Sequence, residues 1–571
     1  MTAADQTTAS AETSTGSKFD SVLDDALAAL AGRTYFSRYP ESPSPRVYGE
    51  TAAAQGLSAY EGRLGKPFEG LQGAFDDTTV GDEVSPYGPT LGVAYPHLDV
   101  DAAMAAATDA IPAWRDAGPR RRALVLIEAL DALNKQSFEI GNAVHHTSGQ
   151  PFVMAFQAGG PQAQDRGLEA VAAAYAEQSR VPESVTWEKP GKGEPLRMQK
   201  DYRIVPRGVA LVVGCNTFPT WNAYPGIFAS LATGNAVVIK PHPRAILPLA
   251  ITVETLQQTL SDNGFDPKLV QLAPEADGEG LAKTLAERDE VKIIDYTGGP
   301  TFGAWLEREG AARGQQVYTE KAGVNTVVVD STDNVRAMLG NLAFSLSLYS
   351  GQMCTTPQNI YLPKDGIDTD EGHLSFEEFG AKLGGAIGKL TGEDEKAVEI
   401  LGATVNDDVR ARAGSLDKIA SDAGGSVVAD TRQVTHPKYP DAVVRTPGLI
   451  GVGVEAQGAY TTEQFGPVTF LIGTDGTDQS LSTFRDTVRK HGAMTASVYS
   501  TDEAVLDKAR DAAMDAGVAL SENLLGQVFV NQTAAFSDYH GTGANPAANA
   551  AYADSAFVAG RFRVITARRH V

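Results

Sequence analysis

The amino-acid sequence predicts an α/β fold with doubly wound parallel sheets. Short apolar runs alternate with helical stretches beyond residue 207, and residues 209–213 and 236–239 are two such runs. Residues 249–260 follow the second run with the apolar spacing of a helix. Strands that are apolar at every position are typical of parallel sheets, because helices cover both faces. Strands that alternate with helices therefore favour a doubly wound architecture.

Four further regions can be distinguished along the chain. Residues 1–17 contain almost no large apolar side chain, so we expect a disordered tail. Residues 184–206 are polar around a Pro-Gly-Lys-Gly turn and predict a hairpin. A second α/β region begins near residue 325 and runs to about residue 545, and residues 561–565 predict a closing strand. A chain of 571 residues is too long for one core, so two or three domains are expected.

Charge and cysteine content exclude several classes of function. The chain has 48 Lys and Arg against 71 Asp and Glu, a net charge of −23. Such an acidic protein repels phosphate backbones and anionic lipids, so we expect neither a nucleic-acid nor a membrane partner. Two cysteines in so long a chain exclude a disulfide scaffold and indicate a reducing compartment. The first residues lack the features of a signal peptide, so we predict a cytoplasmic protein.

Two residues are candidates for covalent and acid–base chemistry. Cys354 follows Ser-Gly-Gln-Met, a sequence that suits a thiol on an exposed turn. A small buried apolar residue is the alternative, and it describes most free cysteines. Glu320 lies just beyond a short β-like run and could serve as a general base. A solvated surface glutamate is the alternative there.

Three further motifs suggest a bound ligand. Residues 297–303 place glycines after a predicted strand and before a predicted helix, where backbone can approach a dinucleotide. Lys240 ends the apolar run 236–239, at the edge of a parallel sheet where ligands bind. Residues 463–468, Glu-Gln-Phe-Gly-Pro-Val, form a turn signal. A charged cap on the sheet edge and a loop anchored by Phe465 are the structural alternatives.

The order and spacing of these motifs resemble the aldehyde dehydrogenase superfamily. Gly-Asn-x-Val-Val-x-Lys-Pro precedes the glycine turn, a lone Glu320 follows, Gly-Gln-x-Cys comes 34 positions later, and the Glu-x-Phe-Gly-Pro-Val motif is last. The resemblance extends from about residue 99 to the C-terminus. The N-terminal extension, residues 217–221 and residues 560–564 look most like the PaaN-type semialdehyde dehydrogenases of phenylacetate degradation.

The resemblance implies a three-part architecture. A Rossmann-type nucleotide-binding domain would comprise residues 18–183 and 207–321, and an α/β catalytic domain residues 322–545. A small oligomerisation unit would combine the hairpin 184–206 with residues 546–571. A protruding hairpin and a terminal strand leave sheet edges that a second subunit can cover, so we expect a homodimer or a higher homo-oligomer.

The resemblance also implies a covalent mechanism. Cys354 would attack the aldehyde carbonyl, hydride would pass to a nicotinamide, and Glu320 would activate water to hydrolyse the thioester. The oxyanion would need the Cys354 backbone N–H and an asparagine side chain. Counting back from Lys240 puts Thr217 in that position, with Asn216 one residue earlier. We favour Asn216 after a one-residue shift, and the Thr217 hydroxyl is the alternative.

The cofactor residues follow from the same resemblance. Lys240 would bind the adenosine ribose, usually with an acid three residues later, but this sequence has Pro243 there. His242 and Arg244 flank that proline, so a cation rather than a carboxylate is present for a 2′-phosphate. The cofactor is therefore predicted to be NADP, with NAD as the alternative.

The nicotinamide half of the cofactor would contact other motifs. Glu463 matches the acid that holds the nicotinamide ribose, and Phe465 the aromatic residue beside it. Gly298 and Gly303 match the pyrophosphate-side turn and the start of the following helix.

The implied reaction is oxidation of an aldehyde to an acid, and a CoA-linked semialdehyde is the suggested substrate. Such an anionic molecule would require a local basic patch on this acidic protein. A CoA-acylating dehydrogenase is a second hypothesis, but it would not need Glu320. A catalytically silent structural protein on the same scaffold is a third, and the retention of both Cys354 and Glu320 argues against it.

Overall fold

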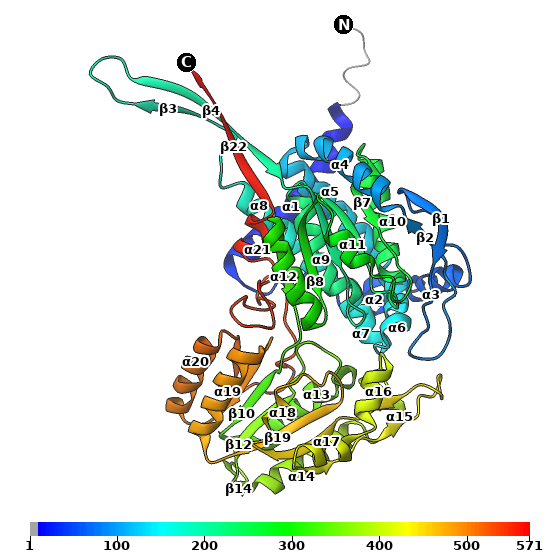
Figure 1. Ribbon diagram of the computed structural model, residues 1–571, viewed down its shortest axis with the longest axis vertical. Coiled ribbons are helices and arrows are strands. Elements are labelled where there is room, and N and C mark those ends of the chain that lie inside the picture. The colour runs from blue at the N-terminus through cyan, green and yellow to red at the C-terminus, as the bar shows by residue number, and fades with distance from the viewer. Residues whose placement is uncertain (1–8) are drawn as a thin grey trace.

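The computed structural model describes residues 9–571, with side chains from residue 19 onward. Two α/β regions lie one above the other, each with its own parallel sheet (Figure 1). A narrow antiparallel ribbon projects from the upper region (Figure 1). The prediction of an α/β fold with doubly wound parallel sheets is confirmed. Within residues 9–571, no helix is both long and apolar enough to cross a membrane.

A five-stranded parallel sheet forms the upper region. Its order is β7 (Val270–Leu272), β6 (Ala236–Lys240), β5 (Val209–Val213), β8 (Val291–Thr297) and β9 (Gln316–Glu320). Every residue of β5 and β6 is buried, because helices cover both faces. The helices that follow these strands are α9 (Pro219–Ala232), α10 (Leu247–Asp262), α11 (Leu281–Ala286) and α12 (Pro300–Arg313).

A helical layer from the N-terminal part of the chain packs on this sheet. Its helices are α1 (Ala9–Gly32), α4 (Val100–Asp116), α5 (Gly118–Lys135), α6 (Ser137–Ser148), α7 (Phe152–Gln157) and α8 (Ala163–Gln178). Helix α8 packs lengthwise against α9 and α5. Trp114 is buried, and its indole N–H donates to the carbonyl of Leu231 at 2.8 Å. The bond satisfies the polar atom of a large core side chain.

Helix α1 overlaps the tail for which the sequence predicts disorder, residues 1–17. The helix begins at Ala9, residues 1–8 lie outside the described residues, and the disordered tail stays a prediction. From Phe19 onward, α1 packs into the core through Phe19, Leu23 and Ala26. Once a packed segment has nucleated a helix, each added residue extends it at little cost.

A seven-stranded sheet forms the lower region. Its order is β15 (Ser426–Ala429), β18 (Gly448–Gly453), β19 (Val468–Thr474), β12 (Asn359–Pro363), β10 (Thr326–Val329), β20 (Ala496–Tyr499) and β21 (Leu520–Glu522). All neighbours are parallel except the edge pair β15 and β18. Helices α13 (Val335–Ser347) and α14 (Phe376–Leu390) pack with Val327 and Val329. Helices α19 (Thr477–His491) and α20 (Glu503–Ala516) pack with Val328, so alternate residues of β10 face opposite layers.

A three-stranded antiparallel ribbon projects from the upper region. Strand β4 (Leu196–Pro206) lies between β3 (Ser184–Lys189) and β22 (Phe562–His570), so the hairpin and the C-terminal strand share one sheet. Just before β22, the guanidinium of Arg561 is fully buried and pairs with Asp295 of β8 at 2.6 Å. This ion pair fixes the base of the ribbon to the parallel sheet.

The remaining elements are short connections: α2 (Pro45–Tyr48), α3 (Ala52–Arg63), β1 (Phe75–Val80), β2 (Tyr95–Leu98), η1 (Ala158–Gln162), η2 (Pro267–Leu269), β11 (Ser331–Thr332), η3 (Leu348–Gly351), β13 (Ile367–Thr369), β14 (Gly372–Leu374), α15 (Asp394–Ala397), α16 (Asp407–Ala413), α17 (Leu416–Asp422), β16 (Gln433–Val434), β17 (Val444–Arg445), α18 (Gln457–Tyr460) and α21 (Ser555–Ala559).

Candidate active site

The loop that carries Cys354 is held in an uncommon backbone conformation. Tyr349 and Ser350 have φ angles of 54° and 53°, and Gly351 has 72°. A Cβ added to Gly351 would lie 2.5 Å from the carbonyl oxygen of Gly466. Only glycine fits both the left-handed backbone and the close approach. The glycine of the cysteine motif is thus a steric requirement of the turn.

Gln352 locks the same loop from inside the protein. Its side chain is fully buried, and its Nε2 donates to the carbonyls of Tyr349 at 3.1 Å and Ala403 at 3.0 Å. Its Oε1 accepts the backbone N–H of Val405 at 2.8 Å. A glutamine that satisfies both ends of its amide in this way fixes the backbone next to Cys354.

Asn325 holds the other side of the loop. Its Nδ2 donates to the carbonyls of Cys354 at 2.7 Å and Thr356 at 2.9 Å. Its Oδ1 accepts the backbone N–H groups of Met494 at 2.8 Å and Thr495 at 3.1 Å. One buried amide therefore ties the cysteine loop to the start of β20.

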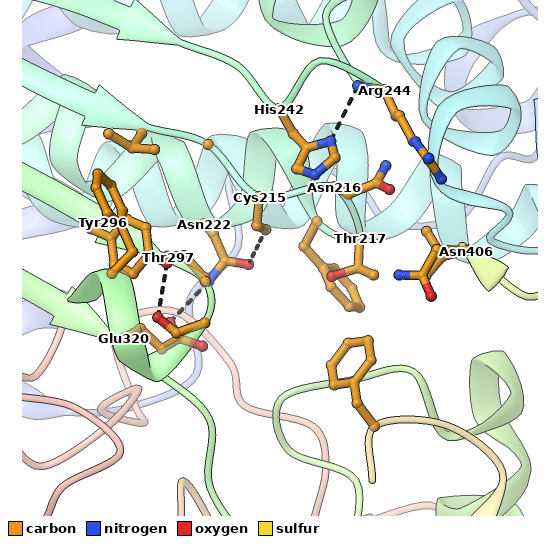
Figure 2. A pocket seen from close by; sticks show the side chains of 18 of the residues that line it. Cys215, Asn216, Thr217, Asn222, His242, Arg244, Tyr296, Thr297, Glu320 and Asn406 are labelled. Carbon is orange, nitrogen blue, oxygen red and sulfur yellow. Dashed lines mark hydrogen bonds between the residues drawn. The ribbon is translucent and has the colours of Figure 1, made fainter. Parts of the chain in front are cut away.

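Glu320 ends β9 at the edge of the upper sheet, and its carboxylate is 3% exposed. Its Oε2 accepts from the Nδ2 of Asn222 at 2.9 Å and from the Tyr552 hydroxyl at 2.9 Å. The Nε2 of His540 lies 3.2 Å from the same oxygen. Figure 2 shows Asn222 between Cys215 and Glu320. The other oxygen, Oε1, accepts no hydrogen bond within the described part of the chain.

Cys354, Glu320 and His540 form a compact cluster. The thiol sulfur, a carboxylate oxygen and a ring nitrogen all lie within 4.8 Å of one another. Burial raises the pKa of the Cys354 thiol well above its usual range, and the Glu320 carboxylate raises it further. Burial, the largest single effect, would raise the pKa of Glu320, but the imidazole of His540 and the hydrogen bonds to the carboxylate together outweigh it and lower the pKa. The resting pair is therefore a neutral thiol beside an ionised carboxylate.

A late segment of the chain delivers His540 and Tyr552 to this cluster. Asn549 pairs with Thr319 through its backbone N–H at 3.1 Å and its side-chain oxygen at 2.8 Å. The backbone N–H of Tyr552 donates to the carbonyl of His540 at 3.1 Å and closes the loop between them. Sequence reasoning missed Asn222, His540 and Tyr552. None of them belongs to a spaced motif, and the pairing of residues 547–549 with the end of β9 brings the last two to Glu320.

Two cavities meet at Cys354. One has a volume of about 770 Å³ and is lined by Lys240, Arg244, Gly298, Glu463 and Phe465 among others. The second measures about 670 Å³ and opens among α7, α8, α9, α13 and the loop that follows α1. Cys354, Phe218 and Asn222 line both cavities. The candidate nucleophile therefore stands where the two spaces join, and Glu320 lines the first.

The first cavity contains a carboxylate that the sequence interpretation did not anticipate. The ammonium of Lys240 is paired with Glu275, which is buried in the loop after β7 and lines the cavity. The statement that no carboxylate accompanies Lys240 is therefore wrong. The acid is supplied 35 residues later in the sequence rather than three. Arg244 is exposed at the same cavity, and its backbone N–H donates to the Nδ1 of His242 at 3.1 Å (Figure 2).

The turn before α12 also lines the first cavity. Gly298 and Gly299 both contribute, and the space where a Cβ of Gly299 would lie is open. Gly303 lies one turn inside the helix, where a Cβ would meet the Lys321 side chain at 2.8 Å. It serves helix packing, and Gly299 takes the cavity position. Glycine backbone at the N-terminus of a 14-residue helix fits the pyrophosphate of a dinucleotide.

Glu463 and Phe465 also line this cavity. Burial raises the pKa of Glu463 to about 7, and its only hydrogen bond in the described structure is a long one of 3.4 Å from the N–H of Gly323. A buried carboxylate with unused acceptor capacity suits a ligand hydroxyl. Phe465 has a positive φ of 42°, so its ring is set by a tight turn before Gly466. These groups, with Lys240 and Glu275, fit the ribose hydroxyls of a dinucleotide.

Asn216 and Thr217 also line the first cavity (Figure 2). One N–H of the Asn216 amide donates to the carbonyl of Thr147 at 2.9 Å. The Thr217 carbonyl accepts from Gln150 at 2.6 Å. The amide that contacts the Glu320 carboxylate is that of Asn222, not Asn216.

The second cavity is mainly apolar and aromatic. Its aromatic lining residues are Tyr35, Phe36, Phe218, Trp221, Phe344 and Phe529.

Its charged lining residues are mostly acids: Glu41, Asp165, Glu399 and Asp538. Arg166 is the one arginine or lysine among them, and its guanidinium is buried against Glu169 at 2.8 Å. This cavity is thus suited to an uncharged group.

Comparisons with known proteins agree with this geometry. The family model described as the aldehyde dehydrogenase family matches residues 94–544. A solved structure described as an NAD-dependent aldehyde dehydrogenase from Burkholderia multivorans shares 53% identity, with a TM-score of 0.95 over 98% of this chain and 99% of that one.

Curated relatives are more distant. The N-succinylglutamate 5-semialdehyde dehydrogenase of Chromobacterium violaceum is 26% identical over 68% of this chain and 74% of its own length. The 1-pyrroline-5-carboxylate dehydrogenase 1 of Halalkalibacterium halodurans is 27% identical to this chain. That match covers 47% of this chain and 50% of the relative. The family match covers most of the sequence and includes Cys354, Glu320 and His540. The chain therefore belongs to the aldehyde dehydrogenase family.

Proposed function

We propose that the protein oxidises an aldehyde to a carboxylic acid, with Cys354 as nucleophile and Glu320 as general base. The observation that carries this proposal is the position of Cys354 at the junction of the two cavities, with Glu320 beside it. One cavity carries groups that fit a dinucleotide, and the other offers an apolar space for the body of an aldehyde. The thiol faces both.

The chemistry follows from the protonation states of this pair. Glu320 takes the proton of the Cys354 thiol through its unpartnered Oε1, and the thiolate attacks the aldehyde carbon. A bound nicotinamide supplies the acceptor for the hydride that leaves this carbon, so that a thioester remains on Cys354. Glu320 next releases the thiol proton to solvent and so becomes a base again. It then takes a proton from water, the hydroxide adds to the thioester, and the acid departs as the sulfur regains that proton from Glu320.

The oxyanion formed on each attack needs fixed donors. We propose the backbone N–H of Cys354 and the second N–H of the Asn216 amide. The first N–H of Asn216 is held by Thr147, and this bond orients the amide plane. The Asn222 amide is already engaged by Glu320 and Cys215, so it serves to orient the base.

The adenosine end of the cofactor would lie near Lys240, Glu275 and Arg244. Arg244 is exposed and can pair with a 2′-phosphate, which supports NADP. Glu275 can accept a bond from a 2′-hydroxyl, which supports NAD. We propose that both cofactors are used and that Arg244 determines how well NADP competes.

We propose an aldehyde whose buried portion is apolar and uncharged. A CoA-linked semialdehyde, as in phenylacetate degradation, would need basic groups, yet the single arginine of the second cavity is already paired. A comparison of kcat/KM for a neutral aromatic aldehyde, an aliphatic semialdehyde and its CoA thioester tests the choice. We expect the neutral aldehyde to be the best substrate. A CoA substrate that is more efficient at low salt, with an advantage that shrinks as salt rises, would reverse this assignment.

Two variants test the mechanism. Cys354→Ala should abolish turnover and leave cofactor binding intact, and Cys215→Ala is the matched control because it removes the other thiol of the chain. Glu320→Gln should slow steady-state turnover by about 10²–10⁴-fold. Wild-type turnover in Cys354→Ala would exclude the proposed nucleophile.

The product formed in the presence of CoA separates the hydrolytic reaction from acyl transfer to CoA. If CoA rather than water takes the acyl group, the wild-type enzyme with added CoA should release an acyl-CoA thioester. We expect only the free acid.

We also propose a homodimer in which a second copy covers the ribbon of β3, β4 and β22. Leu196, Val564 and Ile565 are exposed on it, and β3 and β22 are its open edges. Sedimentation of the wild type and of Ile565→Asp measures the effect. A cytoplasmic location is proposed because Cys215 and Cys354 are both free and the mechanism requires a reduced thiol.

A further inference from the structure

His540 occupies a position that the motif pattern does not assign. Its side chain is 3% exposed, and its Nε2 lies 3.2 Å from the Oε2 of Glu320 and 3.9 Å from the Sγ of Cys354. Trp221 meets the ring edge-to-face at 4.6 Å, and Tyr552 packs on it at 5.3 Å. One ring nitrogen is thus within reach of both groups that exchange a proton in the proposed mechanism.

Other buried histidines of the chain show what a purely structural role looks like. His145 directs its Nδ1 to the carbonyl of Gln150 at 2.6 Å, and His146 directs its Nδ1 to the hydroxyl of Ser85 at 3.0 Å. Both bond to groups that carry no charge. His540 instead directs its Nε2 to a carboxylate and a thiol at the junction of the cavities.

The charge at this position moves during the reaction. Before proton transfer the negative charge is on Glu320, and afterwards it is on the Cys354 sulfur. A single N–H that reaches both atoms can donate to whichever is charged, and a buried donor of this kind stabilises an anion strongly. The titratable groups that face the ring are Glu320, Cys354 and Tyr552, and Arg166 lies beyond Trp221 at 5.4 Å from that indole ring.

We propose that the Nε2–H of His540 donates to Glu320 in the resting enzyme and shifts to the Cys354 thiolate as the proton moves to Glu320. His540 is thereby a further catalytic residue, because its N–H stabilises the Cys354 thiolate in a buried site. The proton passes from sulfur to carboxylate, no atom is gained or lost, and His540 keeps its own proton. This inference rests on the proposed role of Cys354 as nucleophile.

The test measures thiolate formation directly, without substrate or cofactor. Iodoacetamide alkylation of the full-length protein is followed as a function of pH, and peptide mass distinguishes Cys354 from Cys215. We expect His540→Phe to slow alkylation of Cys354 at neutral pH by about tenfold or more and to move its pH midpoint upward. His540→Gln, which keeps an N–H donor, should recover most of the rate.

Tyr552→Phe is the matched control, because it removes a donor to the same Glu320 oxygen but none that reaches the sulfur. We expect it to change alkylation of Cys354 much less than His540→Phe does. A second variant, His540→Ala, does not depend on how a new ring packs. Imidazole added to it should restore the rate of Cys354 alkylation, since His540 lines the second cavity.

Three results would overturn the proposal. They are a pH profile of His540→Phe that coincides with the wild type, an equal loss in Tyr552→Phe, and no rescue by imidazole of a slowed, folded His540→Ala. Failure of the proposed function itself is distinguished by Cys354→Ala, which would then retain turnover whatever the alkylation profiles show.

Discussion

Gly351→Ala should impair the nucleophile while leaving the protein folded. Gly351 has a φ of 72°, a conformation that costs an L-residue roughly 1–2 kcal/mol. The new Cβ would lie 2.5 Å from the Gly466 oxygen, whereas real Cβ contacts are almost never shorter than 3.0 Å. The loop must therefore move by about half an ångström, because Gln352 and Asn325 prevent a larger rearrangement.

The size of the kinetic effect follows from this displacement. A misplacement of about 1 Å costs on the order of 100-fold in rate, so half of it should lower kcat/KM by roughly tenfold. That loss equals about 1.4 kcal/mol of transition-state stabilisation. The unfolding temperature should fall by less than about 3 °C, since the strain is small relative to the unfolding entropy of so long a chain.

Steady-state kinetics and thermal unfolding on the same preparations measure both quantities. Gly385→Ala is the matched control, because Gly385 lies exposed inside α14 with open space around a Cβ. It should leave kcat/KM unchanged and add about 0.5–1 kcal/mol of stability. Wild-type kcat/KM in Gly351→Ala would show that the strained turn does not position Cys354.

Three other predictions concern the cofactor cavity and the ribbon. Arg244→Ala should weaken the binding of NADP by about tenfold and that of NAD hardly at all. Equal losses of affinity for both cofactors would exclude a contact with the 2′-phosphate. Cofactor binding should tighten as the pH rises through about 7, because Glu463 must be ionised to accept hydroxyl groups, and fluorescence titration of Glu463→Gln should show no such step. Arg561→Met should destabilise the fold by about 3–5 kcal/mol, because it leaves Asp295 unpaired, and Asp295→Asn added to it should recover part of the loss in thermal unfolding.

The fold could be predicted because its signals are local. Residues 209–213 and 236–239 are apolar at every position, and a fully buried parallel strand demands that pattern. The turn at 190–193 likewise marks a hairpin that forms from neighbouring residues. The start of α1 at Ala9 carries no such local signal, because residues 9–17 contain no large apolar side chain.

The candidate site divides in the same way. Cys354 and Gly351 could be identified because the conformation of their loop requires particular residues at neighbouring positions. Gly351 avoids a clash with Gly466, and Gln352 bonds the backbone of the same loop. Glu275 and His540 could not, because each arrives from a loop whose path is set by the tertiary fold. A buried carboxylate and a buried histidine at single positions carry no periodic or spaced signal.

The neutral resting state of Cys354 has a consequence for chemical durability. Peroxides oxidise thiolates far faster than thiols, so a cysteine kept protonated by burial beside Glu320 should persist in oxidising conditions. Exposure to damage would then be confined to the short interval in which Glu320 holds the proton and no carbonyl is bound. A saturating concentration of aldehyde should protect the enzyme, because the Cys354 sulfur is then bonded to the substrate carbon. The enzyme should therefore survive longer in peroxide during turnover.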